Sequence, residues 1–254
     1  MSVGERPSWM SAGMIGLGRA RAASQLSGER LALIEVEGRM PYASNTTLLA
    51  RDSGGGRWVY KPERGENPLW DFAWRTLAAR EVLTYEVAVG MGLDLVPETL
   101  LADGPFGPGS AQRFVDEDFD FDPRPLFVPQ VSRQLWPVAV LDLVCNNADR
   151  KIGHLIHDKS TDRLWAIDHG LTFHVEPKLR TVLWGFAGET IPAELVQGLG
   201  TLQSTLTSGL AERVSGLLSA EEAVGIADRV QRLLRHPVHP LPPEDRPAVP
   251  WPII

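Results

Sequence analysis

The hydrophobic pattern changes character once along this chain of 254 residues, and that change limits the folds it can adopt. From Leu31 to about Ala102, β-rich runs such as LALIEVEG and GRWVYKP are separated by turns, and one helical stretch, TLAAREVLTYEVAVGMG, lies among them. From Ser132 onward helical patterns dominate, broken by a short hairpin that turns at Lys159–Asp162. The sequence therefore predicts an α+β fold with an N-terminal antiparallel sheet, one helix beside it, and a mainly helical C-terminal part.

These patterns divide the chain into three expected regions. Residues 1–115 form an N-terminal lobe, and residues 116–236 form a C-terminal lobe that carries most of the polar connections described below. Residues 237–254 contain seven prolines, which favours an extended segment lying on the surface over a separate domain.

Charge and cysteine content argue against several classes of function. The chain has 25 basic and 32 acidic residues, a net charge of −7, which disfavours nonspecific binding to nucleic acid or to an anionic membrane. Cys145 is the single cysteine, so no internal disulfide can form, and a cytoplasmic location is expected. Since no run of about 20 apolar residues occurs, we also expect no transmembrane span.

Polar residues in the first half favour an anion-binding site. The turn GRMPYASNTT contains Ser44 and Asn45 and could cradle phosphates with its backbone N–H groups, with a plain hairpin as the alternative. Lys61 ends an apolar strand, where an inward-facing ammonium group needs an anion and an outward-facing one meets water. Glu81 on the following helix could orient that lysine toward nucleotide phosphates, with Glu86 as the second candidate.

The connection VCNNADRKIGHLI concentrates charge directly after an apolar helix. Asp149 could accept a hydroxyl proton or position a nucleophile. Arg150 and Lys151 could offset the charge of a transferred phosphoryl group. Asn146 and Asn147, by contrast, are also residues that commonly end helices.

Two residues beside the predicted hairpin are candidate metal ligands. His154 opens its first strand, although a single histidine more often has a core or surface role. Asp168 follows the second strand and precedes a glycine, a common position for a Mg²⁺-binding carboxylate, and capping of the turn is the alternative. Five features follow one another along the chain in the order found in two-lobed kinases. They are a glycine-containing turn, a lysine at the end of a strand, a glutamate on the next helix, the Asp-Arg connection and an Asp-x-Gly sequence at the end of a later strand.

Several segments of the sequence resemble the actinobacterial phosphatidylinositol 3-/4-kinase-related family, over roughly residues 31–234. They are VYKPERGENPLWDF, TLAAREVLTYEV, NNADRKIGHLI, AIDHGLTF and LRTVLWGFAGE. The wider group includes HipA-type serine kinases and type II phosphatidylinositol 4-kinases. The resemblance implies a two-lobed protein-kinase-like fold and an ATP-dependent phosphotransferase that uses Mg²⁺ or Mn²⁺, although members of the wider fold also transfer other groups.

The resemblance also implies roles for individual residues. Lys61 contacts the nucleotide phosphates and is held by Glu81, Asp149 is the catalytic aspartate, and Asp168 is the metal ligand. The hinge that meets adenine through its backbone is the segment that contains Gln112, Phe114 and Val115. His154 occupies the position where the family pattern has an asparagine as second metal ligand, and imidazole suits Mn²⁺ or Zn²⁺ better than Mg²⁺. His169 stands where the common motif has phenylalanine.

The phosphoryl acceptor is unknown and could be a protein, a lipid or a small metabolite. The acidic run from Asp116 to Asp122 would repel anionic lipid and favour a cationic acceptor, with a solvated loop as the alternative. Two other functions stay open at this point. One is a nucleotide-binding pseudokinase that regulates or scaffolds a partner, which the histidine at position 154 supports, and the other is an enzyme that transfers AMP.

Overall fold

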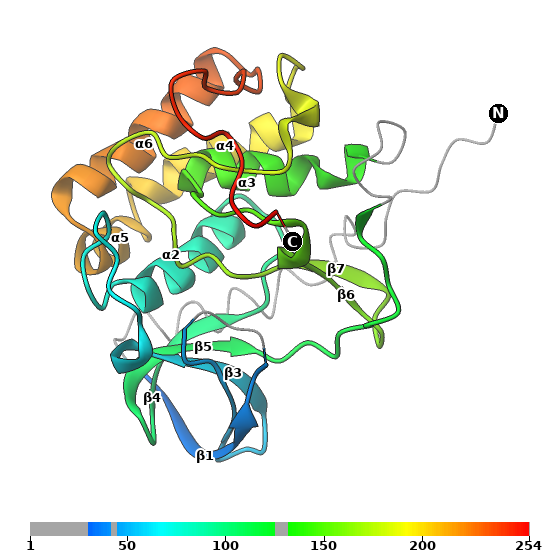
Figure 1. Ribbon diagram of the computed structural model, residues 1–254. Coiled ribbons are helices and arrows are strands. Elements are labelled where there is room, and N and C mark those ends of the chain that lie inside the picture. Colours follow the sequence, from blue (N-terminus) through cyan, green and yellow to red (C-terminus); the bar gives the residue numbers. More distant parts are fainter. Residues whose placement is uncertain (1–29, 42–44, 125–131, 254) are drawn as a thin grey trace.

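The computed structural model describes residues 30–41, 45–124 and 132–253, and Figure 1 shows two lobes with a β-barrel below and helices above. Five strands close the barrel in the order β1-β2-β3-β5-β4. Neighbouring strands are antiparallel except for β1 and β4, which pair in parallel at Leu31 and Ala102. The expected antiparallel sheet is therefore present, and this parallel pair, which the sequence did not predict, closes it. The strands are β1 (Leu31–Arg39), β2 (Leu48–Asp52), β3 (Arg57–Pro62), β4 (Thr99–Gly104) and β5 (Gly107–Arg113).

The barrel interior combines large and small side chains, which fills a narrow space without voids. Trp58 and Tyr60 alternate along β3 with more exposed residues, as expected for a strand with one buried face. Ala50, Ala102 and Ala111 line the same interior and leave room for the two rings. Because Lys61 follows Tyr60, it faces away from this apolar interior.

The C-terminal lobe is mainly helical, as predicted, and has a two-stranded hairpin on one side (Figure 1). The hairpin turns between Asp158 and Arg163, which matches the predicted turn. One short helix, α5, was not predicted from the sequence. The remaining helices and strands are α2 (Leu77–Gly90), α3 (Trp136–Cys145), β6 (Leu155–Asp158), β7 (Arg163–Ala166), α4 (Ala193–Leu206), α5 (Ala211–Leu217) and α6 (Ala220–Arg235). The short 3₁₀ turns are η3 (Glu63–Gly65), η5 (Ser132–Leu135), η6 (Ile152–His154) and η7 (Trp184–Phe186).

Helix α2 joins the lobes, because it contacts strands β4 and β5 on one side and helices α3, α4 and α5 on the other. Its buried Arg80 donates to the Thr172 carbonyl and to Glu222 on α6, both at 2.5 Å. Six residues further along, Glu86 accepts from Arg213 on α5 at 2.6 Å. These ion pairs fasten α2 to the C-terminal lobe, so the position of any side chain on α2 is set by both lobes.

The proline-rich segment, residues 237–253, is irregular, with bends at residues 244–246, 249 and 251–252, and it packs against the C-terminal lobe. Val238 forms an isolated bridge with Thr190, and the Ala248 carbonyl accepts from the Thr181 amide at 3.0 Å. The division of the chain at residues 115 and 236 stays a prediction. Among the described residues, no helix is both long and apolar enough to cross a membrane.

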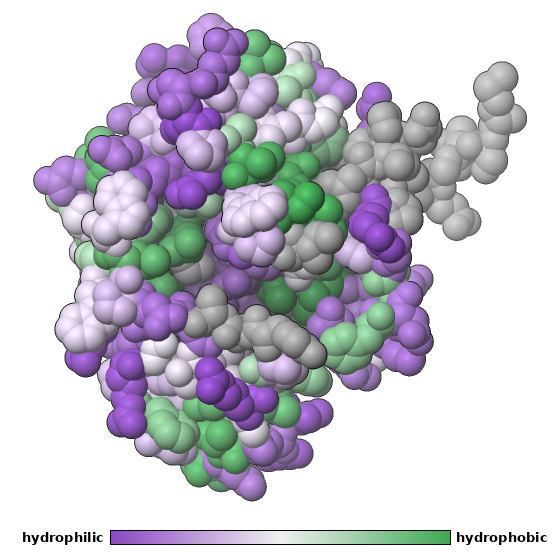
Figure 2. Space-filling model, viewed as in Figure 1, coloured by the Kyte–Doolittle hydropathy of each residue, from purple (hydrophilic) through white to green (hydrophobic). Residues whose placement is uncertain are grey.

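The face shown in Figure 2 is mostly hydrophilic at its margins, and hydrophobic residues are exposed across its middle, where the lobes meet. The most exposed large side chains include Trp70, Trp74 and Trp251, with exposed fractions of 92%, 61% and 90%.

Candidate active site

Three side chains from separate parts of the chain converge where the lobes meet. The Lys61 ammonium group on β3 lies 2.5 Å from a Glu81 carboxylate oxygen on α2 and 3.0 Å from Asp168 Oδ1, just after β7. The three side chains differ in exposure, at 25% for Lys61, 4% for Glu81 and 48% for Asp168. A buried carboxylate thus holds the lysine from behind, and a half-exposed carboxylate meets it at the surface.

The charges of this cluster stabilise one another. Burial alone would lower the pKa of Lys61, but the carboxylates of Asp168 and Glu81 outweigh it and raise that pKa. The neighbouring Lys61 ammonium group, against the opposing effect of burial, holds the pKa of Asp168 well below its usual range. At neutral pH the site therefore presents a charged lysine and a charged aspartate.

The backbone around Asp168 is shaped to present its side chain. Asp168 has a φ of 59°, in the left-handed region that few non-glycine residues adopt. The preceding amide, of Ile167, donates to the His154 carbonyl at 3.0 Å. The following residue, His169, is fully buried, so the chain turns sharply and leaves Asp168 at the surface.

The two asparagines after α3 have structural roles, which is the alternative that their positions allowed. Asn146 ends the helix with a left-handed φ of 52°, and its amide group donates to the carbonyls of His174 and Glu176 at 2.9 and 2.7 Å. The side-chain carbonyl oxygen of Asn147 accepts a hydrogen bond from the Asp149 backbone amide at 3.0 Å. Both residues thus shape the loop of residues 146–151, called the Asp149 loop below.

Asp149 and Lys151 are the partly exposed residues of this loop. Their side chains are 24% and 21% exposed, and their charged atoms lie 3.1 Å apart. Burial is the main influence on Asp149 and raises the pKa of its carboxyl, and the charge of Asp168 acts in the same direction. A carboxylate with a raised pKa is a stronger proton acceptor than an ordinary aspartate.

The structure corrects the role predicted for Arg150. Its side chain is fully buried and makes hydrogen bonds to Asp142 with Nε and Nη2, at 2.9 and 3.0 Å. Nη1 donates to the carbonyls of His154 and Ile167, and Nη2 also lies 2.7 Å from His169 Nε2. With every guanidinium nitrogen occupied inside the lobe, Arg150 cannot reach a phosphoryl group. Lys151, the other basic residue predicted to offset phosphoryl charge, is the one whose ammonium group lies next to the Asp149 carboxylate.

His154 lies close to Asp168, with Nε2 3.3 Å from Oδ2. Burial lowers the pKa of His154 to about 4, so the imidazole is neutral at pH 7. Its other nitrogen, Nδ1, accepts a long 3.5 Å hydrogen bond from the Lys151 amide. The ring therefore points at the same carboxylate that contacts Lys61.

The other residues predicted to bind the nucleotide do not all lie where that prediction requires. Ser44 lies outside the described residues, and the side-chain oxygen of Asn45 accepts from the Asn67 amide at 2.9 Å. Gln112 is paired on both sides in the barrel, with Val59 and Thr99. Its position inside the sheet contradicts the prediction that its backbone meets adenine.

The segment after β5 connects the lobes. The Phe114 amide donates to the Arg57 carbonyl at 3.1 Å, and the Phe114 ring lies under the Arg57 guanidinium. Val115 follows at the start of the connection and is partly exposed. Val115 and the Phe114 carbonyl are thus the parts of the predicted hinge that lie in the segment joining the two lobes.

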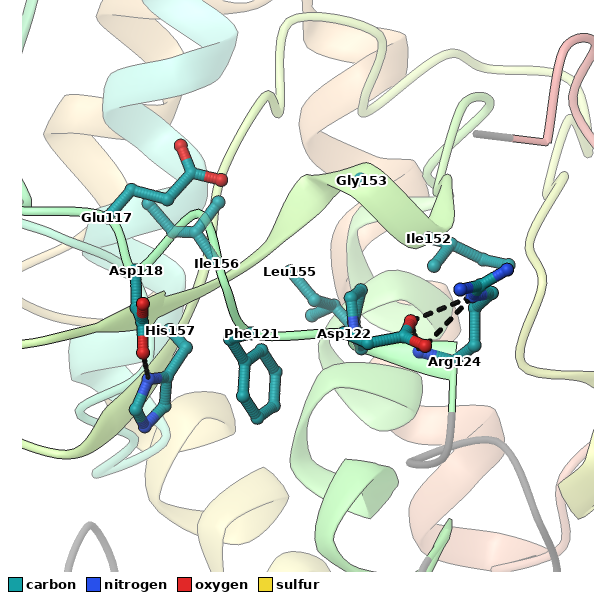
Figure 3. A pocket seen from close by; sticks show the side chains of 11 residues that line it. Glu117, Asp118, Phe121, Asp122, Arg124, Ile152, Gly153, Leu155, Ile156 and His157 are labelled. Carbon is teal, nitrogen blue, oxygen red and sulfur yellow. Dashed lines mark hydrogen bonds and ion pairs between the residues drawn. The ribbon is translucent and has the colours of Figure 1, made fainter.

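A pocket of about 370 Å³ lies between the acidic run and β6 (Figure 3). Phe121 stacks on His157 with ring centroids 4.5 Å apart, and the Asp118 amide donates to the His157 carbonyl at 2.8 Å. Glu117 and Asp122 contribute carboxylates to the lining, and burial raises the pKa of Glu117. The acidic run is thus partly docked: Glu117, Asp118 and Phe121 contact the β6 side, and Asp116, Phe119, Asp120 and Asp122 are exposed to solvent.

The donor set suits a divalent metal that is completed by other ligands. Kinase-like folds commonly use Mg²⁺ or Mn²⁺, and Mg²⁺ is usually held by one or two carboxylates together with phosphate oxygens and water. Asp168 supplies such a carboxylate, and neutral His154 lies beside it. Among the described residues no group of three His, Cys, Asp or Glu side chains forms a complete protein cage. The residues present thus fit a metal shared with a nucleotide.

Comparison with known proteins places this chain in a family. It is 38% identical to "Protein Rv2133c" of Mycobacterium tuberculosis, in an alignment that covers 86% of this chain and 91% of the relative. The chain belongs to the Rv2133c family. No family model matches the sequence.

The fold is kinase-like. The structure is similar to the Helicobacter pylori proinflammatory kinase CtkA, with a TM-score of 0.54 and 12% identity over 82% of this chain and 93% of that one. It is also similar to the Golgi casein kinase, with a TM-score of 0.54 and 13% identity over 85% of this chain and 74% of the other. That kinase has also been solved with Mn and ADP bound, and this second structure matches with a TM-score of 0.54 and 12% identity over 86% of this chain and 75% of the other. The predicted two-lobed α+β kinase-like fold is therefore confirmed.

Proposed function

We propose that this protein is an ATP- and divalent-metal-dependent phosphotransferase related to the phosphatidylinositol 3-/4-kinases. The observation that carries the proposal is the convergence of Lys61, Glu81 and Asp168 at one place between the lobes. A lysine held by a buried glutamate and facing a half-exposed aspartate is the arrangement that protein kinases use to bind the nucleotide phosphates and their metal.

The side chains of the cluster have distinct roles in this proposal. Lys61 binds the nucleotide phosphates, and its pairing with Glu81 keeps it oriented when a nucleotide replaces the contact with Asp168. Asp149 accepts the proton of the acceptor hydroxyl while the new oxygen–phosphorus bond forms and the bond to the nucleotide breaks. Lys151, 3.1 Å from Asp149, offsets the charge on the phosphoryl oxygens.

Asp168 and His154 are the residues that would hold Mg²⁺ or Mn²⁺. When bound, the metal would neutralise charge on the nucleotide phosphates and on the group in transfer. Val115 and the Phe114 carbonyl are proposed to meet the adenine ring, and Asn45 belongs to the turn proposed to cover the phosphates.

The acceptor is proposed to be a protein, a lipid or a small metabolite. The acidic run supports a cationic acceptor over an anionic lipid surface, because its carboxylates outnumber the one arginine of the pocket, Arg124, which pairs with Asp122. The single cysteine, Cys145, is buried and free, which fits the cytoplasmic location proposed for the enzyme.

A nucleotide-binding pseudokinase is the second candidate, and a specific observation favours it. His154 stands in place of the second metal-binding asparagine and approaches Asp168 to within 3.3 Å. If that contact persists when nucleotide binds, the site would hold a nucleotide without transferring its phosphoryl group.

The experiment is to incubate the protein with ATP and either Mg²⁺ or Mn²⁺ and to follow nucleotide turnover, thermal stability and mass. Gain of a phosphoryl group by the chain or an added acceptor, together with ADP release, supports the proposal. Thermal stabilisation without turnover supports the pseudokinase, and gain of AMP indicates nucleotidyl transfer. We expect Asp168→Ala to lower turnover by about 10²–10³ while the fold survives, and wild-type turnover in that variant would contradict the metal assignment.

A further inference from the structure

We propose that the proline-rich segment 237–253 is a positioning element of the active site, which holds the Asp149 loop in place through backbone hydrogen bonds. The proposal rests on the proposed function, because it assigns the segment a role in the same transfer reaction. It assigns no contact between the segment and the substrate.

The Asp149 loop is first tied to a central strip, residues 180–182. The Arg180 amide donates to the Asn147 carbonyl at 2.9 Å, and the Arg150 amide donates to the Arg180 carbonyl at 3.0 Å. The Val182 amide donates to the Arg150 carbonyl at 3.2 Å. The loop and the strip therefore form a short parallel ladder, centred on the bridge between Arg150 and Thr181.

The proline-rich segment lies on the other side of this strip. The amide of Thr181, between the two residues that donate to the loop, donates instead to the Ala248 carbonyl at 3.0 Å. The same carbonyl accepts from the indole N–H of Trp184 at 2.7 Å. Because alternate amides of an extended strand point to opposite sides, the strip is bonded to the loop on one side and to the segment on the other.

The segment also contacts the residue that directly follows the Asp149 loop. The Ile152 amide, three residues after Asp149, donates to the Ile253 carbonyl at 3.0 Å. In Figure 1 the red segment descends across the helical lobe and ends beside β6, close to this point. The loop is thus held through the strip, and the residue that follows it is held by the segment itself.

The composition of the segment suits this task. Proline has no N–H group but keeps its carbonyl, and its fixed φ reduces the entropy lost when an extended chain becomes ordered. The upstream end is anchored, since the Pro237 carbonyl accepts from Ile191 and buried His239 contacts the rings of Trp136 and Trp184. An anchored chain of acceptors can take the amide of Ile152, directly after the loop, and the amide of Thr181 in the strip.

Holding the loop matters because Asp149 is proposed to meet the acceptor hydroxyl. Phosphoryl transfer depends on placement, and a displacement of about 1 Å can lower a rate by roughly 10²-fold. Removing one backbone hydrogen bond at the end of the loop is a smaller disturbance, and we expect a decrease in kcat of about tenfold. Nucleotide binding uses other residues, so the KM for ATP should change by less than about twofold.

The test compares three variants with the unchanged protein. A chain that ends at Pro250 lacks the Ile253 carbonyl, and full-length Trp184→Phe loses the indole hydrogen bond to Ala248 and replaces the larger ring that contacts His239. Leu241→Ala, at a side chain of the same segment that is 73% exposed, is the control. We measure kcat, the KM for ATP, thermal stability, and hydrogen–deuterium exchange of the amides of residues 147–152 and of α4.

We expect the shortened chain to show about tenfold lower kcat and faster exchange in residues 147–152, with unchanged exchange in α4. Trp184→Phe should change kcat in the same direction by about threefold, and Leu241→Ala should change nothing. An unchanged or higher kcat in the shortened chain would overturn the proposal. If the unchanged protein shows no turnover, the proposed function fails, and exchange in residues 147–152 then decides whether the segment holds the loop.

Discussion

Lys61 and Arg150 are two cations that sequence analysis assigned to the same catalytic centre, and the structure separates them. Arg150 has no exposed side-chain surface and shares all its guanidinium nitrogens with Asp142, His169 and backbone carbonyls. Lys61 is 25% exposed and pairs with Asp168, whose side chain is 48% exposed. One ion pair is closed and the other opens to the surface.

The difference shows how a cation that stabilises the fold can be distinguished from a cation that is available to bind a ligand. A closed pair leaves no donor for a ligand, and its partners are satisfied only while the fold is intact. An open pair has a partner that a phosphate or a metal can replace. We therefore expect substitutions at Arg150 to act on stability and substitutions at Lys61 to act on turnover.

The largest effect is expected for Arg150→Met. The change leaves the buried carboxylate of Asp142 without its cation and should lower the free energy of unfolding by about 3–5 kcal/mol, measured by denaturant titration. The double variant Asp142→Leu with Arg150→Met removes both charges and should regain part of that loss. A stable single variant with reduced turnover would place Arg150 back in the catalytic machinery.

Lys61→Met should lower turnover by about 10²–10³, because Lys61 contributes charge to the phosphates. It should also lower the melting temperature, since the buried carboxylate of Glu81 loses its cation, so turnover is measured at a temperature where the variant stays folded. Arg64→Met, on the nearby turn η3, is the matched control and should keep turnover. Unaltered turnover in Lys61→Met would remove the central residue from the proposed site.

Acid should weaken the protein through buried neutral histidines. The pKa of His154 is about 4 in the fold, below the usual value near 6.5, so the unfolded chain binds more protons between these values. Stability from this residue is thus complete above pH 6.5 and falls as pH decreases toward 4, by about 2 kcal/mol at pH 5. Unfolding free energies at pH 7 and pH 5, measured with a chelator, should show a smaller difference in His154→Asn. An equal difference in both proteins would argue against a neutral His154.

The smallest effect is expected for the metal preference of His154→Asn. The substitution places an amide beside Asp168, and oxygen donors suit Mg²⁺ better than imidazole does. Turnover with Mg²⁺ relative to Mn²⁺ should therefore rise by a few-fold. A ratio that stays constant would indicate that His154 does not bind the metal.

Patterns along the chain predicted much of the fold. Alternation in RWVYKP and helix formers around Glu81 placed β3 and α2, and the glycine-free turn at Lys159–Asp162 placed the hairpin. Helix α5 was missed because seven residues give too short a periodic signal. The parallel pairing of β1 with β4 was missed because it depends on barrel closure, which no local pattern records.

The sequence by itself determined which residue types were available: a lysine ending a strand, a glutamate on the next helix and an aspartate after the hairpin. It could not say which of the adjacent Arg150 and Lys151 faces the cleft, because both directions are open to a loop residue until its neighbours are placed. Tertiary structure decided this by surrounding one guanidinium with Asp142 and carbonyl groups. It also brought Ile253 to Ile152 across 101 residues of sequence, a contact that depends on the packing of the whole lobe.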